Sequence, residues 1–117
     1  MIYLKRAYEA PEESDGRRFL VDRLWPRGIR KESLKLDGWL KEISPSPELR
    51  RWFSHEEARW AEFERRYRAE LEQNAQRLQP LLAAAEAGDV TLVFAARDQH
   101  HNSAVILKGF LESLLSG

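Results

Sequence analysis

Phe19-Leu-Val-Asp-Arg-Leu-Trp-Pro-Arg-Gly28 is the most informative segment of this 117-residue chain. Its nearly continuous apolar character predicts a strand over residues 19–25 that is covered on both faces, as strands of parallel sheets are. Pro26 cannot donate a hydrogen bond to a neighbouring strand and therefore ends this one. Asp22 and Arg23 are costly inside such a strand unless they pair with a partner or serve a function.

A second segment, Val90 to Asp98, repeats this design. It predicts a strand over residues 90–96, with Arg97 and Asp98 at its carboxyl end. In open α/β sheets, ligands bind outside the carboxyl ends of the strands. Two strands that both end in charged residues therefore predict a pocket at that edge of the sheet.

The rest of the chain reads as one further strand over residues 2–8 and several helical regions. We expect a short helical turn over 10–16 (a hairpin loop fits equally well), short helical pieces within 29–45, and a helix over 48–53 capped by Ser46. A long helix then starts at the cap Ser54, a helix restarts at Pro80, and a final helix covers 102–115.

Local signals place the two longest helices. Ser54 and Glu57 have the spacing of a capping box at the start of the long helix. Apolar residues three and four positions apart predict its buried face: Trp60, Phe63, Tyr67 and Leu71. Asn102 or Ser103 is the expected N-cap of the final helix. The buried face of that helix is expected to hold Ala104, Leu107, Leu111 and Leu114.

The order of elements predicts the α/β class: a small, mainly parallel sheet of three strands, flanked by helices. Connections of helical length favour parallel pairing of the later strands. At this length the chain is expected to form a single compact domain over residues 1–117.

Composition excludes several classes of protein. The chain has no cysteine, which excludes disulfides, thiolate metal sites and cysteine nucleophiles. It has no apolar run of about 18 residues, so no membrane contact is expected. The sequence also lacks a signal peptide, and the expected location is cytoplasmic. Because 19 basic residues balance 19 acidic ones, binding to duplex DNA is not favoured.

The charged residues near the two strand ends predict a site for a small anionic ligand that bears a phosphate or carboxylate. Arg23 and Arg27 would clamp the charge, because the guanidinium group bonds such groups bidentately. Asp98 and Asn102 would orient the ligand or a water molecule. Further candidates for the wall are Arg50, His55 and Tyr67.

Whether this site is catalytic stays open at this stage, with hydrolysis or group transfer as the reactions considered. The candidate catalytic residues are Asp98, His55 and Asp22. Two simpler interpretations compete with a functional site. Asp22 and Arg23 would belong to a buried structural ion pair, and Asp98 and Asn102 would only brace a loop and cap a helix.

No metal site and no cofactor are expected. The three histidines, His55, His100 and His101, form neither an HExxH motif nor a pair at helical spacing.

A second class of function is a non-enzymatic regulatory or interaction module. Basic residues concentrate around the first predicted strand, between residues 17 and 35: Arg17, Arg18, Arg23, Arg27, Arg30, Lys31 and Lys35. This surface would contact nucleic acid or an acidic protein. The chain is expected to be a monomer or a homodimer, with Trp39 and Trp52 at a dimer interface if they prove exposed.

The residues also resemble a known family, the YeaO-like bacterial domains of unknown function. The similarity rests on Asp15-Gly16, Arg18, Leu20 to Gly28, Lys31, Pro45-Ser46, Leu49-Arg50, Trp52-Phe53, His55, Phe63, Arg66-Tyr67 and Glu70-Leu71. It continues through Thr91-Leu92, Ala95-Ala96, Asp98, Asn102, Ala104 and Val105 to Leu107.

This resemblance implies a compact cytoplasmic α/β domain without an established activity. Longer relatives in the broader superfamily place a Cys-His-Arg motif near the start of the last helix. His101-Asn102-Ser103 stands at that place in this chain. The cysteine and the arginine are both missing, so the resemblance implies no thiol chemistry here.

Overall fold

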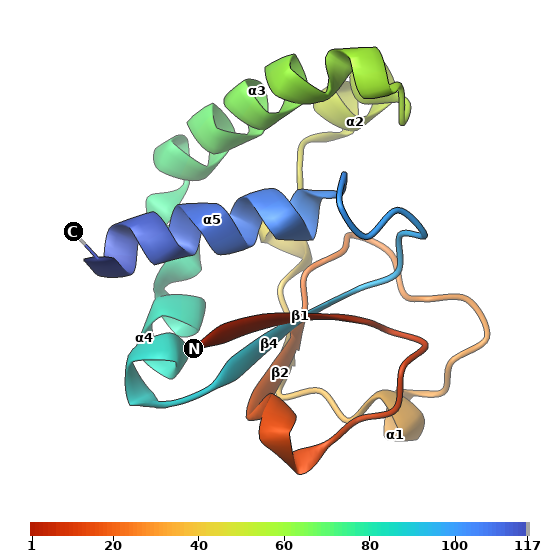
Figure 1. Cartoon of the computed structure of the whole chain (residues 1–117), viewed down its shortest axis with the longest axis vertical. Coiled ribbons are helices and arrows are strands. Elements are labelled where there is room, and N and C mark those ends of the chain that lie inside the picture. Colours follow the sequence, from red (N-terminus) through yellow and green to blue (C-terminus); the bar gives the residue numbers. More distant parts are fainter. Residues whose placement is uncertain (117) are drawn as a thin grey trace.

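Four parallel strands form one sheet in the order β1-β4-β2-β3 (Figure 1). They are β1 (Ile2–Arg6), β2 (Arg17–Leu20), β3 (Gly38–Trp39) and β4 (Val90–Phe94). The structure is a computed structural model and describes residues 1–116. The α/β class and the parallel sheet are confirmed.

Strand β4 is the centre of the sheet, although it comes late in the chain. It pairs with β1 through Ile2↔Val90 and with β2 through Arg17↔Val90. All five of its residues are buried, because strands cover both of its edges and side chains cover both of its faces. The continuous apolar run that predicted this strand follows directly from that position.

The connection between β1 and β2 is not a hairpin. Both strands pair with β4 on opposite sides, and the short 3-10 helix η1 (Glu13–Asp15) lies in the link between them. Gly16 completes this link with φ +64°, and a Cβ atom there would overlap the carbonyl oxygen of Asp89. A non-glycine residue would therefore be strained and would also clash.

Strand β2 differs from its predicted bounds. It begins at Arg17 and ends at Leu20, whereas the apolar pattern predicted residues 19–25. The last backbone bond to β4 runs from the Val21 nitrogen to the Val93 oxygen, 3.1 Å. Beyond it, the side chain of Asp22 accepts from the Ala95 nitrogen, so the two strands separate at this point. Asp22 and Arg23 therefore follow the strand rather than lying within it.

The prediction of three strands was wrong, because the two-residue strand β3 adds a fourth. Two residues are too few to give an alternating pattern. Gly38 allows a close approach here, since a Cβ atom would lie 3.0 Å from the Phe19 ring. The Trp39 indole nitrogen also donates to the Asp22 backbone oxygen at 2.7 Å.

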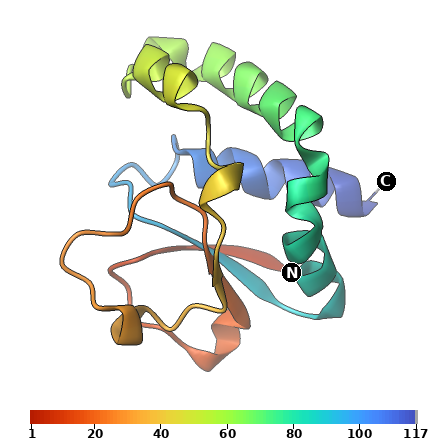
Figure 2. The same cartoon turned by 180° about the vertical axis from the view of Figure 1, so that it is seen from behind.

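Helices α2 to α5 cover one face of the sheet, and the short α1 lies apart from them, as Figures 1 and 2 show from opposite sides. The helices are α1 (Lys31–Leu34), α2 (Pro47–Phe53), α3 (Trp60–Gln73), α4 (Gln79–Ala87) and α5 (Ser103–Ser116). Short 3-10 helices precede α2, α3 and α4: η2 (Lys41–Ile43), η3 (Glu57–Arg59) and η4 (Ala75–Leu78).

Two apolar cores result, one on each face of the sheet. The larger core contains buried residues of α2, α3, α4 and α5 against the sheet. The smaller core joins Leu20 and Val93 to Leu34 of α1, with Trp25 and Ile29 packed against it. On that face, the segment between β2 and β3, which includes the short helix α1, covers the sheet in place of a layer of long helices.

Most of the predicted helix faces are confirmed. Phe63, Tyr67 and Leu71 are buried along α3, and Asn102 caps α5 by accepting from the Val105 nitrogen at 3.1 Å. Leu114 is an exception, because it is 45% exposed near the end of α5.

The predicted start of the long helix was wrong. Ser54 does not cap α3. It ends α2, its nitrogen donating to the Arg50 oxygen, and its φ is +48°. His55 follows with φ +56°, so two left-handed residues turn the chain before η3 and α3 begin.

Within residues 1–116, no helix has both the length and the apolar character that crossing a bilayer requires.

A buried network of charges ties β1, η1, β2 and α1 together. The Asp15 carboxylate binds Lys5 Nζ at 2.8 Å and Arg18 Nη1 at 2.7 Å. Arg18 also donates from Nε and Nη2 to the Leu34 oxygen. Burial alone would raise the pKa of Asp15, but the hydrogen bonds from Lys5, the Glu12 backbone and Arg18 bring that pKa below its usual value.

We predict that Asp15→Asn lowers the free energy of unfolding by about 3 kcal/mol at pH 7, because it leaves the Arg18 guanidinium buried without its anion. A lowered folded-state pKa means that the ionised carboxylate stabilises the fold above the usual Asp pKa and that this contribution is lost as the pH falls. The difference from wild type should therefore shrink between pH 7 and pH 3 in urea unfolding experiments.

Glu13→Gln is the matched control, since Glu13 is an exposed carboxylate in the same turn. It should change the stability by no more than about 0.5 kcal/mol. Equal stability of Asp15→Asn and wild type at pH 7 would contradict a structural role for the network.

Candidate functional site

A cleft of about 640 Å³ lies at the carboxyl ends of β2 and β4. Its walls come from the residues after these strands, from α2 and from the start of α5. They include Asp22, Arg50, Phe53, Ala96 and Ser103. A smaller hollow of about 290 Å³ adjoins it and shares Asp22, Arg50 and Ser103 with it. Arg23 and Arg27 line the smaller hollow but not the larger cleft.

Helix α2 positions Arg50 in the cleft. The helix starts at the N-cap Ser46, whose hydroxyl accepts from the Leu49 nitrogen at 3.2 Å. The Glu70 carboxylate of α3 accepts from the Ser46 nitrogen at 2.9 Å and from its hydroxyl at 2.6 Å, which anchors the start of α2. Arg50 lies one helical turn after Ser46, so the anchored start of α2 also fixes the position of its backbone.

Arg50 is a cation without a local counter-charge. Its Nε atom is buried and has no hydrogen-bond partner within residues 1–116. Burial lowers the pKa of Arg50, and the neighbouring charges of Arg23 and Arg51 lower it further. The site therefore concentrates positive charge, and of these three arginines only Arg51 has an ion-pair partner within residues 1–116, Glu48 at 4.0 Å.

Asp22 lies in the same cleft and is bound by the backbone rather than by an arginine. Its Oδ2 atom accepts from the Ala95 nitrogen at 2.9 Å. Burial raises the pKa of Asp22, and the hydrogen bond from Ala95 opposes this only in part. Within residues 1–116, the partner of Asp22 is therefore a backbone group and not an arginine in a buried ion pair, and Arg23 is exposed.

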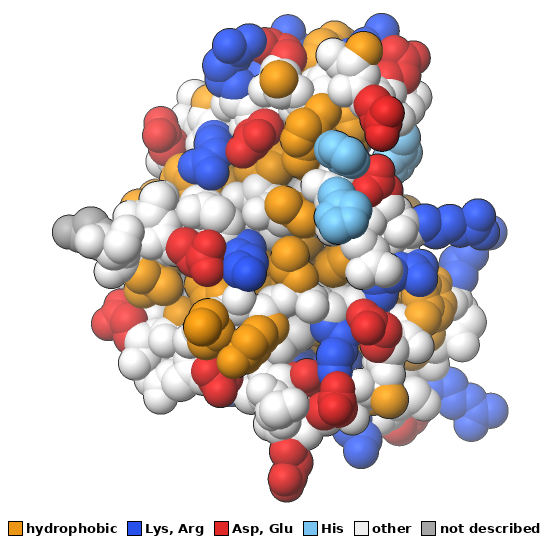
Figure 3. Space-filling view, in the orientation of Figure 1, with side chains coloured by type: hydrophobic (Ala, Val, Ile, Leu, Met, Phe, Trp, Pro, Cys, Tyr) orange, Lys and Arg blue, Asp and Glu red, His pale blue; other side chains and the backbone are white. Residues whose placement is uncertain are grey.

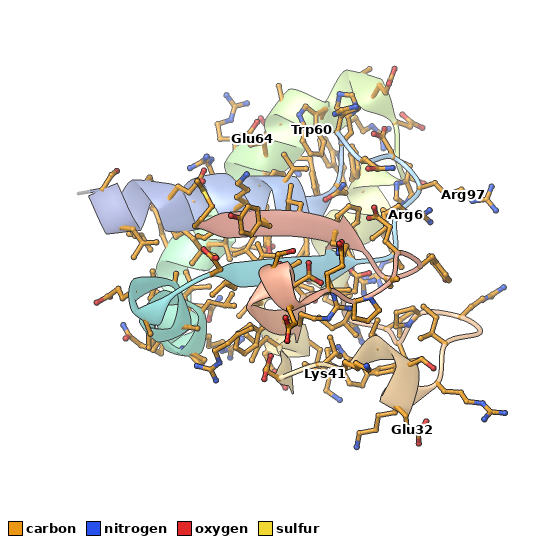
Figure 4. All side chains as sticks on the ribbon, turned by 60° about the horizontal axis from the view of Figure 1, so that its bottom comes forward. Arg6, Glu32, Lys41, Trp60, Glu64 and Arg97 are labelled. Carbon is orange, nitrogen blue, oxygen red and sulfur yellow. The ribbon has the colours of Figure 1, made fainter. Side chains whose placement is uncertain are left out.

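Four other arginines near the strand ends have different surroundings. Arg23 and Arg27 are exposed at the smaller hollow. Arg97 points away from the body of the molecule (Figure 4). Arg6, which no sequence pattern indicated, donates from Nε to the Ala96 oxygen at 2.9 Å and from Nη2 to the Ala95 oxygen at 3.1 Å. It thereby fixes the backbone that forms one wall of the cleft.

Asp98 and Asn102 organise the loop between β4 and α5. Asp98 Oδ1 accepts from the backbone nitrogens of His100 and His101, at 2.9 and 3.0 Å. These two hydrogen bonds lower the pKa of Asp98. Asn102 is buried, and its amide donates to the Asp98 backbone oxygen at 2.8 Å. This is the geometry of a braced loop and a helix cap, the simpler of the two interpretations, and Asp98 lies outside the lining of both hollows.

His55 and Tyr67, the other predicted wall residues, have different positions. His55 is exposed at the edge of the larger cleft, with its ring centroid 5.8 Å from that of Phe53. Tyr67 belongs to the core instead. It is 1% exposed, its hydroxyl donates to the Ile43 oxygen at 2.6 Å, and burial raises its pKa. The expectation that Tyr67 reaches the pocket is therefore corrected.

The basic residues between positions 17 and 35, which are frequent in the sequence, do not form a continuous basic surface in the structure. Arg18 is buried in the network with Asp15 and is only 3% exposed. Arg17 lies over the Phe19 ring, with its guanidinium carbon 5.4 Å from the ring centroid. The basic side chains that remain exposed are Arg17, Arg23, Arg27, Arg30, Lys31 and Lys35.

Four polar cleft residues were not anticipated as site residues: Arg51, Ser54, His101 and Ser103. Arg51 follows Arg50 on α2, and the cap at Asn102 could have indicated Ser103, because it is the first residue of α5. No local sequence signal indicated His101, since its place depends on how the loop after β4 folds.

Comparison with known proteins identifies relatives along the whole chain. A family model described as "Inactive DUF488-N3 subclade" matches residues 1–117. The chain is 47% identical to "Uncharacterized protein YeaO" of Escherichia coli K12, over 97% of this chain and 98% of that protein. It is 39% identical to "Uncharacterized protein Rv3073c" of Mycobacterium tuberculosis H37Rv, over 94% of this chain and 92% of that protein.

No solved structure gave a match. The matches nevertheless extend over essentially the full length of the chain and of both relatives, so they include every residue that lines the cleft. The chain therefore belongs to the YeaO-like family of domains of unknown function, within the inactive DUF488-N3 subclade.

Proposed function

We propose that the cleft between α2 and the start of α5 binds a small ligand that carries a phosphate or carboxylate group, and that the protein acts by binding rather than by catalysis. The observation that carries this proposal is Arg50, whose Nε atom is buried without a hydrogen-bond partner within residues 1–116.

Burying part of a guanidinium group without an anion costs free energy that the folded protein does not recover. Two more arginines, Arg23 and Arg51, add repulsion at the same place. An anion bound between them would supply the missing hydrogen bonds and remove the repulsion. Arginine is suited to this role, because its fork of N–H groups matches the oxygens of a phosphate or carboxylate.

The start of α5 favours the same kind of ligand. This 14-residue helix begins at Ser103, which lines both hollows. The first N–H groups of a helix and its dipole attract negative charge. Helix and arginines thus act on the anion from opposite walls of the cleft.

The other walls indicate the body of the ligand. Phe53, Phe63, Pro45 and Ala96 give the larger cleft an apolar side. Its volume of about 640 Å³ lies in the range of small-molecule sites, roughly 300–1,000 Å³. A molecule with an apolar portion and one anionic group would fit these walls better than a free inorganic anion.

Binding is favoured over hydrolysis or transfer for two reasons. A nucleophilic serine needs a base within hydrogen-bond reach. Within residues 1–116, neither Ser54 nor Ser103 forms a hydrogen bond with a histidine, and Asp98, one of the candidate catalytic residues, is engaged by its own loop. The family description also carries the word "Inactive".

The alternative of a regulatory module that contacts nucleic acid or a protein through residues 17–35 is less well supported. Burial of Arg18 removes one of its cations, and most of the others lie on the loop segments between β2 and β3 rather than on a reading element.

We predict that Arg50→Gln weakens the binding of anions at least tenfold, because it removes the partly buried cation. Isothermal titration with inorganic phosphate and with a small aromatic carboxylate provides the measurement. Saturation of the wild type at about 100 times the Kd should add roughly 2.7 kcal/mol of stability. For a domain of this size, this corresponds to a rise in Tm on the order of 10 °C.

Arg30→Gln is the matched control, since Arg30 is an exposed arginine of the 17–35 surface and lines neither hollow. It should leave the anion affinity unchanged. An equal loss of affinity in both variants would mean that anions bind by general charge attraction, and the proposed site would be wrong. No saturable binding to wild type would also refute it.

We predict that Asp22→Asn stabilises the protein at pH 7 and strengthens anion binding. The amide oxygen still accepts from the Ala95 nitrogen, whereas the charge is lost. Because burial raises the folded-state pKa of Asp22, its ionisation costs stability as the pH rises above the usual Asp value. The variant should therefore exceed wild type at pH 7 by more than the roughly 0.5 kcal/mol of a neutral surface change, and match it below about pH 3.9.

Glu32→Gln provides the comparison for this experiment. Glu32 is an exposed carboxylate of α1 and lines neither hollow. Its substitution should alter neither the pH dependence of stability nor the anion affinity beyond a small change. If Asp22→Asn lowers the stability at pH 7, the ionised carboxylate is a needed partner and not a burial cost.

A further inference from the structure

We propose that Glu57, Asp98 and His101 bind a divalent transition-metal ion of the Zn²⁺ type at the edge of the cleft. Each of the three side chains offers one ligand atom, and these atoms all lie within 4.8 Å of one another. Glu57 comes from η3, and the other two come from the loop between β4 and α5. The site therefore exists only in the folded chain, which is why sequence spacing predicted none.

The distances are close to those of a zinc site. Zinc bonds to nitrogen and oxygen are about 2.0–2.2 Å long, so two ligand atoms of a tetrahedral ion lie about 3.4 Å apart. His101 Nδ1 and Asp98 Oδ2 are already 3.1 Å apart. Glu57 has an exposed side chain, so a change of rotamer can bring its carboxylate into the same range.

The histidine is held in position before any ion arrives. Its ring packs edge-on against Trp60, with centroids 5.1 Å apart and planes at 88°, and Figure 4 shows where Trp60 lies at the start of α3. Asp98 is fixed in turn by the backbone nitrogens of His100 and His101. Ligands that are oriented by a surrounding shell lose little freedom on binding a metal.

The local charge also favours a cation. The carboxylates of Glu57 and Asp98 each place an oxygen within 4.8 Å of the other. Within residues 1–116, the only ion-pair partner of Asp98 is His101. Figure 3 shows histidine and acidic side chains gathered on one part of the surface, with the basic side chains mostly elsewhere. A divalent ion would compensate this negative charge.

The ligand set selects the type of ion. One imidazole and two carboxylates suit a borderline ion such as Zn²⁺, whereas Mg²⁺ prefers an octahedron of oxygens with several waters. Three protein ligands also leave a fourth tetrahedral position open. Because His101 lines the cleft, the ion would lie at its edge. The metal site does not depend on the proposed anion site, since none of its three ligands is an arginine of the cleft.

The test is calorimetric titration of the chelator-treated full chain with Zn²⁺, and with Mg²⁺ in a parallel series, in the absence of phosphate. We expect one Zn²⁺ per chain and no comparable uptake of Mg²⁺. Glu57→Gln and His101→Gln should each weaken Zn²⁺ binding by about tenfold or more. Substitution with Co²⁺ should give the visible absorption of a tetrahedral centre, which disappears in both variants.

Two matched controls separate the site from the general surface. His100→Gln removes the adjacent exposed histidine, and Glu72→Gln removes an exposed carboxylate of α3. Both should bind Zn²⁺ as wild type does. Glu57→Gln should also keep the wild-type Tm in the absence of metal, which shows that loss of binding is not loss of folding.

Three results would overturn the site: no saturable Zn²⁺ uptake, equal losses in His100→Gln and His101→Gln, or equal affinity for Mg²⁺. A protein that binds Zn²⁺ but no anion would leave the metal site standing and refute only the proposed function. The opposite pattern would refute only the metal site.

Discussion

At the point where β2 and β4 separate, a side chain replaces the backbone as the hydrogen-bond acceptor between the two strands. The Asp22 carboxylate accepts the Ala95 N–H at 2.9 Å, immediately after the last backbone hydrogen bond between the two strands. With a main-chain partner at this place the ladder would continue, and the two chain segments would stay together. Because the carboxylate satisfies Ala95 instead, the strands diverge and their carboxyl ends open into the cleft. Asp22, Ala95 and Ala96, which line the cleft, lie directly at this divergence.

Arg18 and Arg50 show how the fold treats the same side chain in two ways. Arg18 is enclosed, yet Asp15 and the Leu34 carbonyl receive its donors. Arg50 is less enclosed, and its Nε atom still lacks an acceptor. When all donors of a buried network have acceptors, a structural role is enough to account for the network. A buried donor without an acceptor beside an open cleft needs another explanation, and a bound ligand would provide one.

Much of the fold followed from local patterns, and the failures share a cause. The strand over residues 90–94 and the cap at Asn102 depend on the residues themselves, and both were predictable. Ser54 fits a capping box by spacing, but its left-handed backbone arises from the packing of α2 on α3, which no local pattern reports. The two-residue strand β3 likewise exists only because β2 supplies its partner. For the site, the arginines could be selected by type, whereas Tyr67, Arg6 and His101 depend on tertiary contacts.

The central position of β4 has a consequence for how the protein is made. Its neighbours β1 and β2 lie within the first 20 residues, while β4 itself spans Val90–Phe94. In the folded sheet, β4 lies between β1 and β2. During synthesis these two early strands therefore leave the ribosome well before the strand with which both of them pair. The sheet can close only when nearly the whole chain has emerged, so the nascent protein exposes apolar strands for most of its translation. Such late closure of contacts between distant parts of the sequence slows folding and leaves apolar surface exposed until the chain is nearly complete.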